Sequence, residues 1–82
     1  MICVIIDEEA SEDDVKYLCE RFGRIKRVKL VRDNYTKISR GVAYVDFYDE
    51  QSALSAVEKL NGHKYGSLIL KVELAKPRNN NN

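Results

Sequence analysis

The segment Arg40–Phe47 carries the residues whose chemistry is easiest to interpret. Along this segment Ala43, Val45 and Phe47 alternate with Val42, Tyr44 and Asp46, which predicts a strand with one buried and one exposed face. Val42 and Tyr44 fall on the exposed face. An exposed tyrosine ring offers a surface on which a nucleic-acid base can stack, and Arg40 can bind a phosphate. The segment therefore predicts contact with a nucleic acid.

The charges are distributed unevenly along the chain. The 82 residues have a formal net charge of only +1, but the charges are strongly segregated. Residues 7–14 contain six acids and no base, whereas residues 21–40 contain eight bases and Asp33 as the single acid. Such blocks predict that opposite faces of a folded domain carry opposite charge. The basic face is either a solvated surface or a binding surface for a polyanion, depending on where it falls on the fold.

The sequence lacks the residue clusters that metal binding or catalysis would require. Cys3, Cys19 and His63 are the only cysteines and histidine, too few for the four ligands of a structural zinc. The acids of residues 7–14 have no nucleophile beside them in the sequence, and they suit the positive end of a helix dipole. We expect no cofactor, no metal and no enzymatic activity.

Two segments have helical periodicity. In the first segment, Ser11 and Asp14 have the spacing of a capping box at the start of the helix, and Gly23 can serve as its C-terminal cap. Asp49 can cap the second helix, which Asn61 and Gly62 close. The apolar residues of both recur at the spacing of one helical face: Val15, Leu18, Cys19 and Phe22, then Ala53, Ala56, Val57 and Leu60.

Four strands are expected around these helices, at residues 1–6, 25–32, 41–47 and 68–74. The order β-α-β-β-α-β predicts an α+β, ferredoxin-like sandwich with a four-stranded antiparallel sheet and two helices on one face. We expect one domain at residues 1–77 and a disordered, Asn-rich tail at 78–82. The candidate binding residues are those expected on the open face of the sheet, together with Arg40 just before the third strand: Cys3, Ile5, Arg27, Lys29, Arg40, Val42, Tyr44, Lys71 and Glu73.

Residues 2–77 resemble the RNA-recognition motif family, most specifically in Arg40–Phe47, which departs from the family octapeptide only at Val42. The resemblance implies single-stranded RNA binding on the sheet. Cys3 and Val42 stand where the family usually has aromatic residues, and each lost stacking contact costs about 1–3 kcal/mol. We therefore predict weak, salt-sensitive binding that is largely tolerant of RNA sequence.

Residues 68–77 resemble the end of the motif in the g-subunit family of eukaryotic translation initiation factor three, and Tyr65 before them has a counterpart there. This resemblance implies a module of a larger assembly that contacts messenger or ribosomal RNA in the cytoplasm, with the nucleus as an alternative location. We expect the isolated domain to be monomeric, with no membrane association.

A protein–protein interaction module, for example in RNA processing, remains the alternative. Such a module would use the aromatic-poor sheet or the acidic first helix with Glu12, Asp13 and Asp14. A peptide-binding variant of the family has an Arg-x-Phe triplet before the last strand, and residues 63–65 lack it. Acylphosphatases share the strand and helix order but need an arginine in the loop after the first strand, where this chain is acidic.

Overall fold

The structure is a computed structural model that describes residues 1–75, so the predicted tail at 78–82 lies outside the described residues. The elements, in chain order, are β1 (Ile2–Ile5), α1 (Glu12–Cys19), the 3-10 turn η1 (Glu20–Phe22), β2 (Ile25–Arg32), β3 (Ser39–Phe47), α2 (Glu50–Leu60), β4 (Lys64–Tyr65), β5 (Leu68–Ile69) and β6 (Lys71–Leu74).

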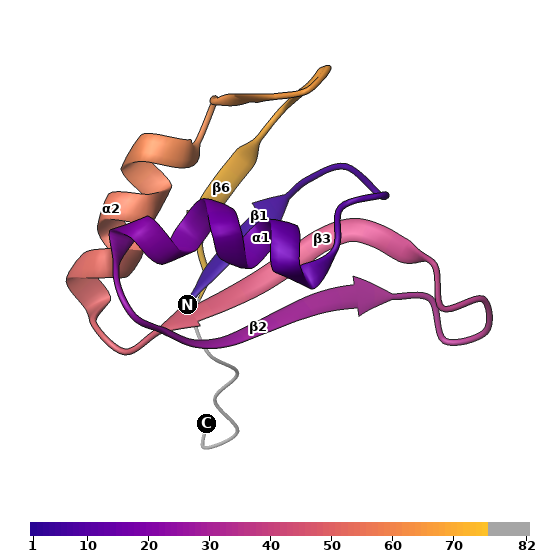
Figure 1. Cartoon of the computed structure of the whole chain (residues 1–82), viewed down its shortest axis with the longest axis horizontal. Coiled ribbons are helices and arrows are strands. Elements are labelled where there is room, and N and C mark those ends of the chain that lie inside the picture. Colours follow the sequence, from indigo (N-terminus) through magenta and orange to yellow (C-terminus); the bar gives the residue numbers. More distant parts are fainter. Residues whose placement is uncertain (76–82) are drawn as a thin grey trace.

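Four of these strands form one antiparallel sheet in the order β2-β3-β1-β6. The helices α1 and α2 lie on the same side of this sheet and leave its other face open (Figure 1). The predicted ferredoxin-like α+β fold is confirmed. The open face is the surface on which the candidate residues were expected.

Both helix starts follow from short-range hydrogen bonds. The backbone N–H of Asp14 donates to Ser11 Oγ at 3.2 Å, and the Ser11 N–H donates to the Asp14 carboxylate at 2.9 Å. These two bonds form the predicted capping box. At α2, the Gln51 N–H donates to Asp49 Oδ1 at 3.1 Å, as the sequence also predicted.

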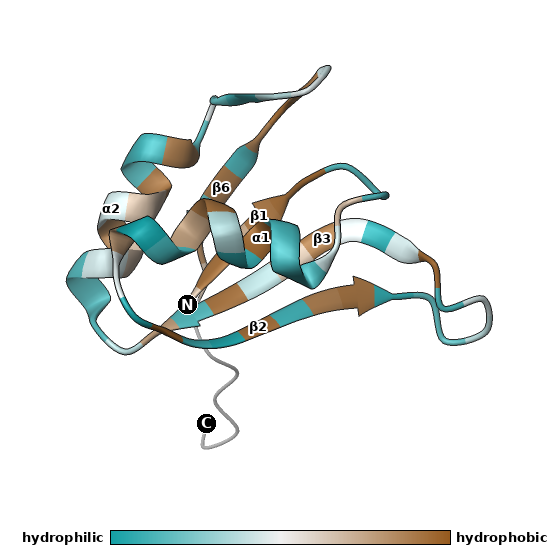
Figure 2. Ribbon diagram, viewed as in Figure 1, coloured by the Kyte–Doolittle hydropathy of each residue, from teal (hydrophilic) through white to brown (hydrophobic). Residues whose placement is uncertain are grey.

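The core lies between the helices and the inner face of the sheet. Figure 2 shows apolar residues along β1 and an alternation of apolar and polar residues along α2. The largest fully buried side chains come from every layer of the sandwich: Ile2, Val4, Val15, Cys19, Val45, Leu60, Leu70 and Val72. Burial of one face of each element fixes which strand residues remain for the open face.

The expectation of one continuous strand at residues 68–74 is wrong. The chain leaves the hairpin of β4 and β5 at Ile69, and only β6 pairs with β1. Gly66 makes the hairpin turn with a positive φ of 63°. Ile69 is consequently outside the main sheet, and Leu74 is 53% exposed because it lies at the end of an edge strand.

The outer edge of β6 is occupied by the turn after α2. The Val72 N–H donates to Asn61 Oδ1 at 3.0 Å, and the Gly62 N–H donates to the Leu70 carbonyl at 2.8 Å. These bonds satisfy groups that a bare edge strand would leave open to pairing with another chain. They also hold β6, and therefore Lys71 and Glu73, in place on the sheet.

Candidate nucleic-acid interface

The strand register arranges the open face in rows. One row crosses all four strands in the order Lys29, Tyr44, Cys3 and Glu73. In this row the tyrosine on β3 has a lysine on one side and a small thiol on the other. A base stacked on Tyr44 would therefore have a positive charge toward β2 and the Cys3 thiol toward β1.

A second row lies beside the first and is mainly aliphatic. Val42 on β3 lies opposite Ile5 on β1, and Ile5 lies opposite Lys71 on β6. Ile5 is 38% exposed, and the Val42 side chain is half-buried. The structure thus places all the predicted sheet residues on the open face, with Arg40 exposed two residues before Val42. Their role in RNA binding stays a prediction.

Gly41 allows the start of β3 to approach the end of β1. The Ile6 N–H donates to the Gly41 carbonyl at 2.8 Å, and Gly41 has a positive φ of 75°. A Cβ atom on this glycine would lie 2.7 Å from the Ile6 carbonyl oxygen, closer than packing permits. The glycine therefore brings Arg40 and Val42 beside β1.

The structure also shows an acid that the candidate set did not include. Asp46 lies opposite Arg27 in the β2–β3 ladder. The period-2 alternation of β3 already placed Asp46 outward, but only the register gave it this partner. Glu73, by contrast, lies opposite Cys3. Burial and the nearby Glu73 carboxylate raise the pKa of the Cys3 thiol, which stays neutral at physiological pH.

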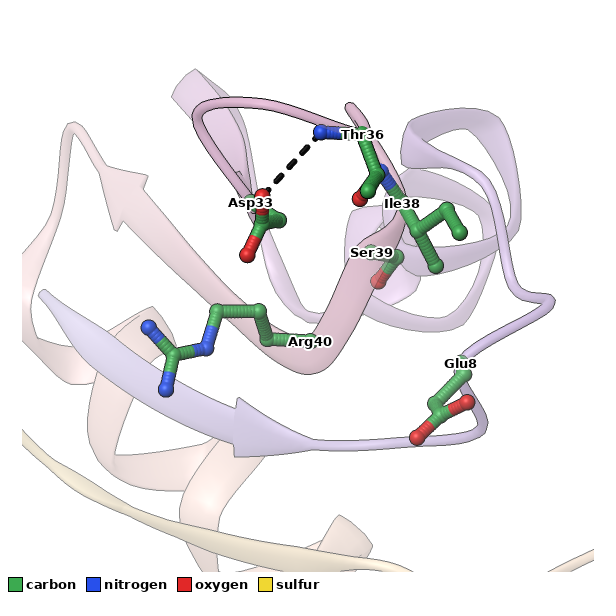
Figure 3. A pocket seen from close by; sticks show the side chains of 6 residues that line it. All are labelled: Glu8, Asp33, Thr36, Ile38, Ser39 and Arg40. Carbon is green, nitrogen blue, oxygen red and sulfur yellow. Dashed lines mark hydrogen bonds between the residues drawn. The ribbon is translucent and has the colours of Figure 1, made fainter.

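The loop between β2 and β3 borders an open hollow of about 320 Å³ at the end of the sheet (Figure 3). Its lining comes from this loop and from the loop after β1: Glu8, Asp33, Thr36, Ile38, Ser39 and Arg40. The Asp33 carboxylate accepts hydrogen bonds from the backbone N–H groups of Thr36 at 3.1 Å and Tyr35 at 2.8 Å. These bonds and the charge of Arg40 lower the Asp33 pKa, so this loop is held by an ionised carboxylate.

Two of the three acids on α1 already make contacts within the domain. The Glu12 carboxylate accepts a hydrogen bond of 3.4 Å from the Leu30 N–H of β2, and Asp14 belongs to the capping box. Of the acids proposed to receive a basic peptide, only Asp13 has no such role in the hydrogen bonds described. This arrangement weakens the case for α1 as a peptide-binding surface.

Neither metal binding nor membrane insertion gains support from residues 1–75. Within this range no group of three or more histidine, cysteine or acidic residues is placed to hold a metal ion. Cys19 is buried in the core, and its burial raises the thiol pKa to about 11. None of the helices described is long and apolar enough to span a bilayer.

Comparison with known proteins identifies relatives of the whole folded region. A family model described as RNA recognition motif matches residues 5–71. The g-subunit of eukaryotic translation initiation factor 3 from Aspergillus clavatus is 45% identical over 71 residues, which cover 87% of this chain and 24% of the relative. The chain thus spans about a quarter of the length of the curated relatives it matches. The predicted resemblance to this g-subunit family is confirmed.

Solved structures agree with the sequence relatives. The RRM of Rna15 superposes with a TM-score of 0.86 at 32% identity, covering 90% of this chain and 86% of that one. A structure of the Rna15 RRM with bound RNA (GU) has a TM-score of 0.83 at 31% identity, with coverages of 93% and 82%. The similarity extends over the sheet as well as the helices.

Proposed function

The chain belongs to the RNA recognition motif family, and on that premise we propose that its open sheet face binds single-stranded RNA as a module of a translation initiation factor. The observation that carries this proposal is the row in which Tyr44 lies beside Lys29 on the face opposite the helices. A ring for stacking beside a cation for phosphate is the pair of contacts that single-stranded RNA requires. RNA binding by this family is not enzymatic, in agreement with the sequence.

We propose further that binding is weak and largely independent of RNA sequence. Tyr44 is the one aromatic side chain among the predicted sheet residues, because Cys3 and Val42 replace two of the usual rings. The cations Arg27, Lys29, Arg40 and Lys71 contact phosphates, which contribute affinity but no base readout. The structure of the similar Rna15 RRM with bound RNA (GU) supports RNA binding by a domain of this fold.

The target and the setting follow from the similarity to the g-subunit of the initiation factor. We propose that the domain contacts messenger or ribosomal RNA within a larger initiation assembly in the cytoplasm, and that the domain by itself is monomeric. The comparisons give no support to the nuclear alternative. The domain boundaries at residues 1 and 77 stay a prediction, since the family match covers 5–71.

A titration of the ¹⁵N-labelled chain with a short mixed-sequence RNA tests the proposal. We expect chemical-shift changes in residues 2–5, 27–31 and 42–46, on the open face. Tyr44→Ala should weaken binding by removing a stacking contact worth about 1–3 kcal/mol. Tyr17→Ala is the matched control, because Tyr17 is 77% exposed on α1. Shifts confined to residues 12–20 would instead favour the protein-binding alternative.

A further inference from the structure

The acids on the open face have unequal surroundings. Asp46 lies opposite Arg27 in the β2–β3 ladder, so its cross-strand neighbour is a base. Glu73 lies opposite Cys3 in the β1–β6 ladder, and β6 is the edge strand, so it has a cross-strand neighbour on one side only. The Glu73 side chain is exposed. A carboxylate therefore stands on the proposed RNA-binding surface without a cation opposite it.

Such a carboxylate lowers the affinity for a polyanion unless it meets a hydrogen-bond donor of the RNA. Phosphates have no donor, but the bases do, and single-stranded RNA leaves their Watson–Crick edges accessible. An ionised carboxylate has two oxygens that accept and no group that donates. The Glu73 carboxylate is thus suited to contact a base edge that carries hydrogen-bond donors, and unsuited to contact the phosphate backbone of the RNA.

A single-stranded RNA that crosses the sheet along this row would bring a base within reach of Glu73. Cys3 separates Tyr44 from Glu73 in the row, and neighbouring strands lie about 4.8 Å apart. The backbones of Tyr44 and Glu73 are therefore about 10 Å apart. A base next to the one stacked on Tyr44 would lie over Cys3 on β1 with its edge toward β6.

We propose that Glu73 accepts hydrogen bonds from the Watson–Crick edge of a guanine lying over Cys3. This inference rests on the proposed function and adds one base preference to otherwise sequence-tolerant binding. Guanine presents two neighbouring donors, N1–H and the N2 amino group, which match the two oxygens of a carboxylate. Adenine and cytosine present an amino donor beside an acceptor nitrogen, and uracil has its N3–H between two carbonyl oxygens, so each fits less well.

The test compares three short RNAs that differ at one position: oligouridine with a central guanine, inosine or uracil. Inosine lacks only the N2 amino group of guanine. We expect the parent chain to bind the guanine RNA about five- to a hundredfold more tightly than the uracil RNA, as a bidentate contact does. The inosine RNA should fall between them. Glu73→Gln should reduce the guanine-to-uracil ratio to about one.

Asp46→Asn is the matched control, because it removes an acid from the same face without removing Glu73. It should strengthen binding of all three RNAs alike and leave their ratios unchanged. A guanine preference that survives Glu73→Gln, or a parent chain with equal affinity for the three RNAs, would overturn the inference. Amide spectra of each variant verify that the fold is intact.

Tyr44→Ala separates this inference from the proposed function. If Tyr44→Ala weakens binding of all three RNAs while Glu73→Gln leaves the ratio unchanged, only the role of Glu73 is wrong. If Tyr44→Ala leaves every affinity unchanged with the fold intact, binding on the sheet is itself wrong, and the guanine site is excluded with it.

Discussion

Val42 on β3 lies directly opposite Ile5 on β1, and the two side chains form an aliphatic surface beside Tyr44. Both side chains belong to the open face, while the residues on either side of Val42, Gly41 and Ala43, are buried. A change of side chain at Val42 therefore alters the proposed RNA surface without changing the core.

Val42→Phe should strengthen RNA binding by adding a second stacking surface next to Tyr44. Base stacking on an aromatic ring is worth about 1–3 kcal/mol, which corresponds to about five- to 150-fold in affinity. Valine and phenylalanine are both favoured in strands, so the free energy of unfolding should change by less than about 1 kcal/mol. Fluorescence anisotropy with a labelled RNA measures the affinity.

Leu54→Phe is the control for this gain, since Leu54 is 42% exposed on α2. It adds the same ring on the helical side and should leave RNA affinity unchanged. Equal gains from both variants would mean that the added ring acts non-specifically, and an unchanged affinity for Val42→Phe would count against stacking at this position.

RNA affinity should fall steeply with salt. If Arg27, Lys29, Arg40 and Lys71 each bind one phosphate, the slope of log K against log salt is about −3, from about −0.7 per phosphate on a single strand. Lys29→Gln should make the slope shallower by about 0.7 and weaken all RNA sequences alike. Lys16→Gln, on α1, should leave it unchanged. A slope near zero would contradict phosphate contacts as the main source of affinity.

Gly41→Ala should destabilise the fold beyond the cost of its positive φ. A non-glycine residue in this conformation costs about 1–3 kcal/mol, and the new methyl group would also meet the Ile6 carbonyl oxygen. Gly66→Ala has a similar φ but nothing within 4 Å of its Cβ, so it measures the φ cost alone. Urea unfolding gives both free energies. Equal losses would show that the approach of Gly41 to Ile6 adds nothing.

The stability of the fold should decrease between pH 9 and pH 11 because of Cys19. Burial raises the pKa of this thiol from its ordinary value of 9.0 to about 11. Above pH 9 the thiol ionises in the unfolded chain while it stays neutral in the folded one, so rising pH favours unfolding. The loss is about 2.3 kcal/mol at pH 11 and reaches its full value of about 2.7 kcal/mol only above pH 11, at about 1.36 kcal/mol for each unit by which the pKa is raised.

Cys19→Ala isolates this effect from the other groups that titrate in the same range. The variant is less stable at every pH because it leaves a cavity, but its stability should decline less between pH 9 and pH 11 than that of the parent. Parallel pH dependences of the two proteins would show that the Cys19 thiol has the same pKa in the folded and unfolded states, so that burial does not raise it.

The sequence by itself determined which residues share a face and where the helices begin. Alternation along β3 separated Val42 and Tyr44 from Ala43 and Val45 because side chains alternate across any strand. The capping box of Ser11 and Asp14 follows likewise from a spacing of three residues. These features depend on neighbours in the chain, so a pattern of residue types is enough to predict them.

Only the tertiary structure decided which residues lie opposite one another. The position of Glu73 beside Cys3 depends on the register between β1 and β6, whose residues are some 70 positions apart in the sequence. The break of the last strand at Leu70 depends on the turn after α2, which supplies hydrogen bonds to the edge of β6. Ladder hydrogen bonds form between distant segments, and the pattern within one segment does not specify their pairing.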